Sequence, residues 1–533
     1  MTSPQLANLD SPPEPAGPLI DELVYERRWK ILAILCLSLV TIVIAVSSLN
    51  VAIPTIIGAL NAKSTESLWI IESYALTFAI FLLPAGALGD RYGRKWALLG
   101  GLGLFGSMAF LASFATGPSH LIAARALMGV GAAFIMPATL SIITHTFPPE
   151  ERNKAIAMWA GFAGAGGALG PLMSGLALKW FSWSAVFLVN LPLVILLIVL
   201  VIAFVPNSRD PHGHALDPIG ALISVFMLGG LVLAIIEGPE WGWTSPGVLG
   251  ALLCALVGAV AFIGYERSVA QPMLDPRLFK RRGFSMGSLG LVLAFFSMFG
   301  VFYVASQYLQ FVHGYTALET GVRTLPSAAM MILISPRSPQ ISAQLGVKRA
   351  VRLGFLLIAV GLFGMAQLTE TSSYPPFAVS LMLMASGMGV LMAPCSAMIV
   401  SSVPLSKAGV GSAVNDVTRE VGGAIGIAVT GSVLSAGYSS SMATKTAKVP
   451  LPPAIREAVE DSIGKAYIVA ERAASQVGAE SAMALRKAAA ESFISGSHNA
   501  LLLASAVALV GSLTVGTWIP NVAPIPGSEP EAL

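Results

Sequence analysis

The chain has 533 residues, of which 55% are hydrophobic and only 11% are charged. This composition leaves too few polar side chains to cover a soluble globule, and a formal net charge of +3 is too small for a nucleic-acid-binding protein. The three cysteines fall in separate apolar stretches without metal-ligand spacing, so they indicate neither a metal site nor a cofactor. The composition therefore predicts an integral membrane protein.

Residues 1–26 are rich in Pro and acidic side chains and lack the features of a signal peptide, which predicts a disordered cytoplasmic tail. Apolar stretches of membrane-spanning length then recur about fourteen times. Their cores lie near 31–58, 68–88, 97–115, 120–143, 155–178, 184–205, 217–236, 246–264, 285–311, 316–335, 351–368, 375–402, 408–436 and 497–518. We predict an all-α integral membrane protein with about 14 transmembrane helices.

The distribution of basic residues predicts the orientation. Most of the 31 Lys and Arg residues fall in loops or helix ends that this helix count places in the cytoplasm, as the positive-inside rule requires. An even number of helices puts both termini, including a second tail at 519–533, on the cytoplasmic side. We expect a multi-pass protein of the cell membrane that is surrounded by lipid and is a monomer.

The sequence also indicates an internal repeat. "PAGALGDRYGRK" follows the second helix, and "SPQISAQLGVKR", which keeps a Gly and a basic end, follows the tenth. This predicts two six-helix pseudo-repeats, 27–210 and 269–518, separated by an inserted helix pair with its loops at 211–268. Residues 437–496 alternate apolar and charged side chains at helical spacing, which predicts an extracytoplasmic amphipathic hairpin that is either a lid or a cap.

Two charged residues lie inside early apolar spans. Glu72 stands in helix two within "WIIESYALTFA", two residues before Tyr74, and Arg125 stands in helix four within "RALMGVGAA". A charge in a membrane helix is costly and usually faces a partner or an aqueous cavity. The alternative for Arg125 is that it extends outward to the nearby membrane surface.

The stretch "GALGDRYGRK" concentrates charge between two apolar runs. Its Gly residues let helix ends approach closely, its Asp can meet a helix N-terminus or a cation, and its basic residues can clamp a neighbouring helix. We predict a conformational latch here, whereas the alternative is an anchor that only sets orientation. The predicted latch residues are Gly86, Asp90, Arg91, Gly93, Arg94 and Lys95.

Helix five contains "GAGGALGPLMSG", in which Gly166, Gly170 and Gly175 permit close helix packing and Pro171 interrupts the hydrogen-bond ladder. On helix nine, the side chains of Phe299, Tyr303 and Gln307 are candidates for a cavity wall. Contacts with lipid or core are the alternative for such aromatic residues.

Helix thirteen reads "GSAVNDVTREVGGAIG" and places Asp416 and Glu420 four residues apart, on one helix face. Two carboxylates at this spacing can share a proton and exchange it for a cation. Alternatively, Arg419 or Arg323 neutralises them in purely structural salt bridges.

Enzymatic functions find little support in the sequence. There is no HExxH, no Ser-centred elbow and no Walker A pattern, so we expect neither hydrolytic chemistry nor ATP as the energy source. "DPHGHALDP" offers His212, His214 and Asp217 to a metal, but a solvated loop is the simpler interpretation, and we predict no metal site.

The pattern G-x-L-x-D-R-x-G-R-K at 86–95 resembles the loop signature of the major facilitator superfamily, which lies between helices two and three on the cytoplasmic side. Arg125 resembles the second signature, in which a membrane arginine takes part in proton coupling. The glycine-rich stretch of helix five is similar to the antiporter signature G-x-x-x-G-P-x-x-G-G, with Ser174 in place of one Gly.

Within this superfamily, residues 27–518 resemble the fourteen-helix drug/proton antiporters, which carry acids that match Glu72, Asp416 and Glu420. The resemblance implies proton-coupling residues Glu72, Arg125, Asp416 and Glu420. It and the helix-nine pattern suggest substrate-binding residues Asn50, Glu72, Tyr74, Phe299, Tyr303, Gln307 and Asp416. One departure is Ala45, where the branch often has an Asp, and this puts strongly cationic substrates in doubt.

The resemblance implies alternating-access efflux of amphipathic, lipophilic small molecules in exchange for protons. The alternatives are a dedicated exporter of one endogenous metabolite or lipid and a membrane scaffold or sensor that does not transport.

Overall fold

The computed structural model describes residues 22–60, 62, 64–209, 217–404, 407–447, 449–476 and 479–521, and these are helical with no strand among them. Twelve helices in this part of the chain are long and apolar enough to cross a membrane. The 32-residue helix α5 and the 18-residue helix α11 pack among them, which agrees with the predicted number of about fourteen. Helices are favoured because a helix satisfies its own backbone hydrogen bonds in lipid.

The first half of the bundle ends before residue 210. Its helices are α1 (Glu22–Leu60), α2 (Ser64–Tyr92), α3 (Arg94–Ala112), α4 (Pro118–Thr146), α5 (Pro149–Trp180), α6 (Ala185–Leu188) and α7 (Leu191–Phe204). Helix α1 begins at Glu22, so residues 22–26 belong to a helix and not to the predicted tail. The Arg28 side chain stabilises this start, because it donates a hydrogen bond to the Tyr25 carbonyl oxygen (2.6 Å) and lies over the Tyr25 ring.

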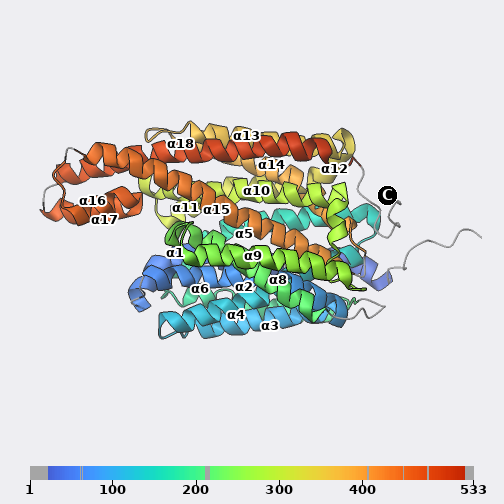
Figure 1. Ribbon diagram of the computed structural model, residues 1–533. Helices are drawn as coiled ribbons and strands as arrows, with labels where there is room; N and C mark the ends of the chain where they lie inside the picture. Colours follow the sequence, from blue (N-terminus) through green and yellow to red (C-terminus); the bar gives the residue numbers. More distant parts are fainter. Residues whose placement is uncertain are drawn as a thin grey trace, which may run out of the picture.

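The inserted pair and the second half follow. Their helices are α8 (Pro218–Trp241), α9 (Pro246–Ser268), α10 (Arg282–Gln307), α11 (Ala317–Ile334), α12 (Ser338–Leu345), α13 (Val347–Ala366), α14 (Tyr374–Ser401), α15 (Ala408–Thr446), α16 (Pro453–Asp461), α17 (Ile463–Gln476) and α18 (Ala479–Trp518). Short 3-10 turns lie at Pro276–Lys280 and Ser335–Arg337, and a π-helical turn continues α10 over Tyr308–Val312. Figure 1 shows the two halves as two groups of helices, with α8 packed on α2 and α15, and α9 packed on α8.

The same kind of helix contact, in which two glycines bring the backbones together, occurs in both halves. In the first half a Cβ on Gly101 of α3 would lie 2.7 Å from the Gly131 carbonyl oxygen of α4, and in the second a Cβ on Gly354 of α13 would lie 2.9 Å from the Gly387 oxygen of α14. Such backbone contact requires Gly on both helices. The turns that open α3 and α13 also match, because each uses a Gly with positive φ (Gly93, 116°; Gly346, 81°).

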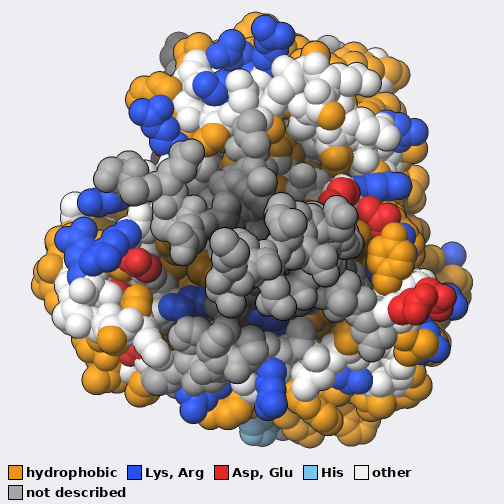
Figure 2. All heavy atoms as spheres, turned by 90° about the vertical axis from the view of Figure 1, so that its right-hand side faces the viewer, with side chains coloured by type: hydrophobic (Ala, Val, Ile, Leu, Met, Phe, Trp, Pro, Cys, Tyr) orange, Lys and Arg blue, Asp and Glu red, His pale blue; other side chains and the backbone are white. Residues whose placement is uncertain are grey.

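The halves meet through α5 with α11 and α14, and through α2 and α4 with α15. The bundle has two different ends, which Figure 1 separates from right to left. We call the right-hand end, where α2 ends and α15 begins, the basic end, because Lys and Arg side chains are spread over this face in Figure 2. The opposite end, which carries α16 and α17, is called the hairpin end.

The predicted hairpin at 437–496 is built differently from two free-standing helices. Helices α15 and α18, of 39 and 40 residues, are nearly twice as long as a membrane crossing requires, so they continue past the bundle, and α16 and α17 connect them. The Tyr438 hydroxyl donates to the Val459 carbonyl oxygen (2.9 Å), and Lys445 pairs with Glu491 (2.7 Å). The Tyr467 hydroxyl of α17 donates to the Phe311 carbonyl oxygen, in the π-helical turn after α10 (2.6 Å), which fixes the hairpin to the second half.

Candidate functional site

The Asp90 carboxylate, near the end of α2, joins the two halves at the basic end. Its Oδ1 accepts a hydrogen bond from the Gly409 amide (2.9 Å), and its Oδ2 accepts one from the Val410 amide (3.2 Å). These amides lie in the first turn of α15, where helix N–H groups lack partners and the helix dipole favours a negative charge. Asp90 is only 6% exposed and therefore caps a helix that lies 319 residues further along the chain.

The basic residues after Asp90 contact other side chains and helices of the first half. Arg94 donates to Asp90 Oδ1 through Nε (2.8 Å) and Nη2 (2.6 Å), and its Nη1 contacts the His145 ring of α4. Lys95 Nζ donates to the Ile202 carbonyl oxygen in the last turn of α7 (2.9 Å). The Arg91 guanidinium lies over the neighbouring Tyr92 ring. Arg94 thus holds Asp90 from the side of the first half, while the α15 amides hold it from the second.

The glycines of this stretch are required by close approach and by backbone conformation. A Cβ on Gly86 would lie 2.6 Å from the Gly409 carbonyl oxygen, so α2 and α15 are in backbone contact at this level. Gly93 has a φ of 116°, which a residue with a side chain rarely adopts, and a Cβ there would lie 2.6 Å from Asn207 Oδ1. The Gly spacing therefore positions Asp90 against the start of α15.

The glycines of α5 bring it against α1 and α11. A Cβ on Gly166 would lie 2.9 Å from Val43, a Cβ on Gly170 would overlap the Ser47 hydroxyl, and a Cβ on Gly175 would lie 3.3 Å from Leu318 of α11. Helix α5 thus packs closely on both halves. The side chain of Pro171 lies outside the described residues, as does that of Asn50.

Glu72 and its neighbours form the first charged group inside the bundle. Arg125, 1% exposed, donates through Nε to the Ile70 carbonyl oxygen (3.1 Å), and its guanidinium lies 4.5 Å from the centre of the Tyr74 ring. It is also within electrostatic range of Glu72. The burial of Arg125 contradicts an outward-extending side chain and places the guanidinium between α2 and α4.

A further carboxylate in this group was missed by the sequence reasoning. Glu237, in the penultimate turn of α8, is 5% exposed and lies within electrostatic range of Glu72. The core of the apolar stretch predicted for this helix ends near residue 236, so Glu237 lies just beyond it. In the sequence, the position of Glu237 directly after an apolar run is the signal that could have identified it as a buried charge. The packing of α8 on α2 shows that it lies on a helix beside the one that carries Glu72. We call Glu72, Glu237 and Arg125 the first charged group.

The second charged group consists of Asp416, Arg419 and Glu420 on α15. Arg419 Nη1 lies 3.4 Å from Asp416 Oδ1, and its guanidinium packs over the rings of Trp159 (5.4 Å) and Phe295 (4.8 Å). Asp416 is fully buried, and its Oδ2 has no hydrogen-bond partner among the described residues. The structural alternative thus holds in part, since Arg419 pairs with one oxygen of Asp416.

The two charged groups lie at different depths along the bundle, and Tyr74 lies within electrostatic range of both. Glu420 is twelve residues into α15, about 18 Å from the basic end, and Glu72 is eight residues into α2, about 12 Å from the opposite end. The Tyr74 hydroxyl, 2% exposed and without a described hydrogen-bond partner, interacts electrostatically with both Arg125 and Glu420. Each group contains two acids and one arginine.

The three residues predicted to line a cavity on the ninth membrane helix lie on α10, and two of them pack along α15. Phe299 packs on Gly423, Tyr303 lies near Gly431 and is 43% exposed, and Gln307 is partly buried one turn further along. All three are on one face of α10, four residues apart.

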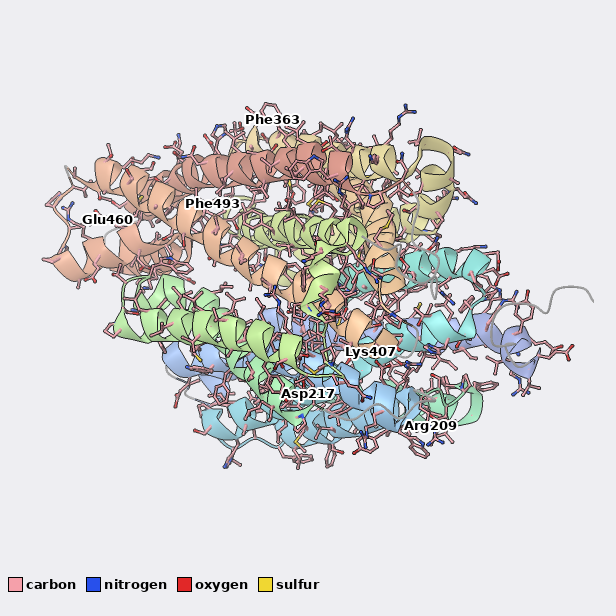
Figure 3. All side chains as sticks on the ribbon, turned by 45° about the vertical axis from the view of Figure 1, so that its right-hand side comes forward. Arg209, Asp217, Phe363, Lys407, Glu460 and Phe493 are labelled. Carbon is pink, nitrogen blue, oxygen red and sulfur yellow. The ribbon has the colours of Figure 1, made fainter. Side chains whose placement is uncertain are left out.

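No group of three potential metal ligands occurs in the described part of the chain. Asp217 instead caps α8, since its Oδ1 accepts from the Gly220 amide (2.7 Å). His212 and His214 lie outside the described residues. Figure 3 places Asp217 near Lys407 at the basic end, and Glu460 far away on the hairpin.

Two six-helix halves with buried carboxylates between them, and a helix cap that joins the halves at the basic end, define a membrane carrier of the alternating-access class. The Major Facilitator Superfamily profile matches residues 35–427. The chain belongs to this superfamily.

Relatives and solved structures agree with this assignment. The chain is 31% identical over 492 residues to multidrug resistance protein Stp of Mycobacterium tuberculosis (90% of each chain) and 33% identical over 491 residues to multidrug efflux pump LfrA of Mycolicibacterium smegmatis (92% of this chain, 96% of that one). Methyl viologen resistance protein SmvA of Salmonella typhimurium is 34% identical over 507 residues (92% and 98%).

Among solved structures, the human organic anion transporter MFSD10 superposes with a TM-score of 0.60 at 14% identity, over 91% of this chain and 99% of that one. The likeness shows that the fold is shared. The multi-span architecture and the bacterial efflux-pump relatives place the protein in a cell membrane.

Proposed function

We propose that the protein exports amphipathic small molecules, cationic ones among them, in exchange for protons. The observation that carries this proposal is the second charged group, in which Asp416 and Glu420 lie with a single Arg419 on a helix that contacts both halves. A buried acid in low dielectric favours a proton or a cation over a bare charge. The relatives named for drug and methyl viologen resistance support this substrate class.

In the proposed cycle, the acids take up protons while they are accessible from the hairpin end, and substrate displaces the protons when access changes to the basic end. The cap of α15 by Asp90 holds the basic end closed and must break for that change. The basic side chains of Figure 2 support a cytoplasmic basic end, with both termini cytoplasmic. The transporting unit in this proposal is a monomer in lipid.

The energy source is the proton gradient. A proton that crosses a potential of about 100 mV gains roughly 2.3 kcal/mol, which supports a concentration ratio of roughly fortyfold for an exchanged neutral substrate. The coupling requires that the same carboxylates accept either proton or substrate. Arg125, Glu72 and Tyr74 complete the proposed substrate and proton path beside the second charged group.

The test is uptake of ethidium, a lipophilic cation, into proteoliposomes with an imposed proton gradient. Asp416→Asn and Glu420→Gln should each abolish gradient-driven uptake. Glu151→Gln, which removes a carboxylate from an ion pair at the surface of the first half, is the matched control and should transport normally. Absence of gradient-dependent flux from well-folded wild type, or full flux in both acid variants, would contradict the proposal.

A further inference from the structure

The second half carries a patch of basic side chains at the basic end of the bundle. The patch is formed at the starts of α10 and α13, and we call it the second-half basic patch: Arg281, Arg282, Lys348, Arg349 and Arg352. Lys348 is partly buried, and the other four side chains are exposed. Figure 2 shows Lys and Arg side chains gathered at the top of this face, where Figure 1 places α13 and α18.

The end of α18 brings the two parts of this patch together. A Cβ on Gly283, in the first turn of α10, would lie 3.9 Å from the Pro520 ring. A Cβ on Gly346, directly before α13, would lie 3.7 Å from Asn521 Oδ1. Because Pro520 and Asn521 are consecutive residues, their Cα atoms are only about 3.8 Å apart. The long basic side chains at the starts of α10 and α13 can therefore reach one molecule that lies over the end of α18.

The protein supplies no counter-charge to this patch. Helices α10, α12, α13 and α14 contain no Asp or Glu, and both acids of α18, Glu480 and Glu491, lie in its first half, toward the hairpin. None of the five basic residues forms an ion pair within the described part of the chain. Arg281 donates to the Ser402 carbonyl oxygen (2.9 Å), which orients its guanidinium but leaves its charge. Like charges that converge in this way repel each other, and a bound anion relieves the repulsion.

The corresponding stretch of the first half has its own carboxylate. There, Asp90 stands three residues before the Gly that opens α3, and it pairs with Arg94 at 2.6 Å. In the second half, Ala343 stands three residues before the Gly that opens α13, and Lys348 and Arg349 follow. The second half therefore has the basic part of the repeat without the acid that neutralises it, which leaves the charge for a molecule outside the protein.

The patch lies at the level where phospholipid headgroups are found. Trp518, at the end of α18, is 64% exposed, and exposed Trp side chains collect at the membrane–water interface. Arg352 lies close to this level, because a Cβ on Gly516 would be 3.0 Å from the Arg352 Cβ. Beyond Arg352 the large exposed side chains of α13 are all apolar: Leu353, Leu356, Val360 and Phe363. A phosphate bound at the patch would thus have its acyl chains along an apolar helix face.

We propose that the second-half basic patch binds a phospholipid that carries two phosphate groups. One phosphate lies against Arg349 and Arg352 at the start of α13. The other lies against Arg281 and Arg282 at the start of α10, with the end of α18 between them. Guanidinium groups bind phosphate oxygens through paired N–H donors, and basic pockets between membrane helices suit lipids of this class. The inference goes beyond the proposed function, because lipid binding does not depend on what is transported.

The test measures lipid binding directly. Delipidated protein in detergent is titrated with cardiolipin, which has two phosphates, or with phosphatidylglycerol at equal phosphate concentration, and bound lipid is counted by native mass spectrometry. Wild type should bind one cardiolipin at least tenfold more tightly than phosphatidylglycerol. Arg349→Gln/Arg352→Gln should weaken cardiolipin binding at least tenfold, which is about 1.4 kcal/mol, and Arg281→Gln/Arg282→Gln should do the same. Arg349→Lys/Arg352→Lys keeps the charge and should retain most of the affinity.

The matched control is Lys30→Gln/Arg267→Gln, which removes two exposed basic residues of α1 and α9 and should leave cardiolipin binding unchanged. If a double Gln variant does not purify as a monodisperse protein, Arg352→Gln alone decides and should weaken binding at least threefold. Unchanged affinity in the patch variants, an equal loss in the control, or equal affinity of wild type for the two lipids overturns the inference. So does cardiolipin binding that appears only in Glu529→Gln/Glu531→Gln, because the patch would then belong to the acidic residues that follow α18 in the sequence.

Discussion

Replacement of Asp90 by Asn should open the basic end of the transporter. The carboxylate holds the start of α15 through the Gly409 and Val410 amides, and it pairs with Arg94 at 2.6 Å in a site that is 6% exposed. Asn keeps one acceptor oxygen but loses the charge that both the helix N-terminus and Arg94 favour.

The magnitude follows from these contacts. A hydrogen bond to a charged group contributes about 1.5–3 kcal/mol, and loss of one such contribution weakens the closed basic end by roughly ten- to a hundredfold. The substitution changes the free energy of the closed conformation relative to the open one, and not that of the folded protein relative to the unfolded one. Arg94 keeps its contact with His145, and each half keeps its own packing. We therefore expect a change in conformational population with a nearly unchanged thermal midpoint.

The assay is a distance measurement between spin labels at Tyr92 and Leu345, which are exposed on opposite halves near the basic end. Cys254, the exposed one of the three free cysteines, is replaced by Ser beforehand. Asp90→Asn should add a population at longer distance and slow transport, whereas Glu151→Gln, which removes an ion pair within the first half, should add none. An unchanged distance distribution with wild-type flux would refute the latch and leave only an orienting anchor.

Three further predictions concern packing and surface charge. Gly170→Ala should overpack against α1, which should lower the stability by about 1–3 kcal/mol and the thermal midpoint with it. Gly167→Ala is the control and should not lower the midpoint, because nothing lies within 4 Å of the added Cβ. Equal midpoints for the two variants would contradict the packing. Gly409→Ala places a Cβ 2.6 Å from a carbonyl oxygen of α2, so it should lengthen the spin-label distance as Asp90→Asn does, and an unaltered distance would argue against backbone contact there. The Arg28 guanidinium holds the pKa of Glu151 below its usual value, so this surface ion pair stabilises the fold above about pH 4.5, and the stabilisation is lost as the pH falls through the lowered pKa. The thermal midpoint of Glu151→Gln should therefore fall slightly less than that of wild type between pH 7 and pH 3. Parallel curves for the two proteins would show that the pair contributes nothing.

The role of the hairpin was predicted only in outline. The polar alternation of residues 437–496 indicated helices outside the membrane, and the structure has helices there. Whether they lie free or continue a membrane helix depends on contacts such as the one between Lys445 and Glu491, which are separated by 46 residues. Amphipathic spacing defines which face is apolar, but not what that face covers.

The sequence by itself determined that this is a membrane protein of about fourteen helices, because hydropathy and helix length are local properties. It also identified Asp90, Glu72 and Asp416 as charges that require partners, since a buried charge is costly in any fold. The superfamily followed from short motifs whose spacing is likewise local.

Only the tertiary structure decided which partners those charges have. Asp90 accepts hydrogen bonds from the amides of residues about 320 positions away, and α2, which carries Glu72, packs against α8, which carries Glu237 and which the sequence reasoning treated as part of an insertion. Hydrophobic pattern does not specify which helices pack together, because many apolar faces are equivalent in lipid and the choice depends on the fit of small residues such as Gly86 against Gly409. The partners of the charges therefore follow from helix packing across the whole chain.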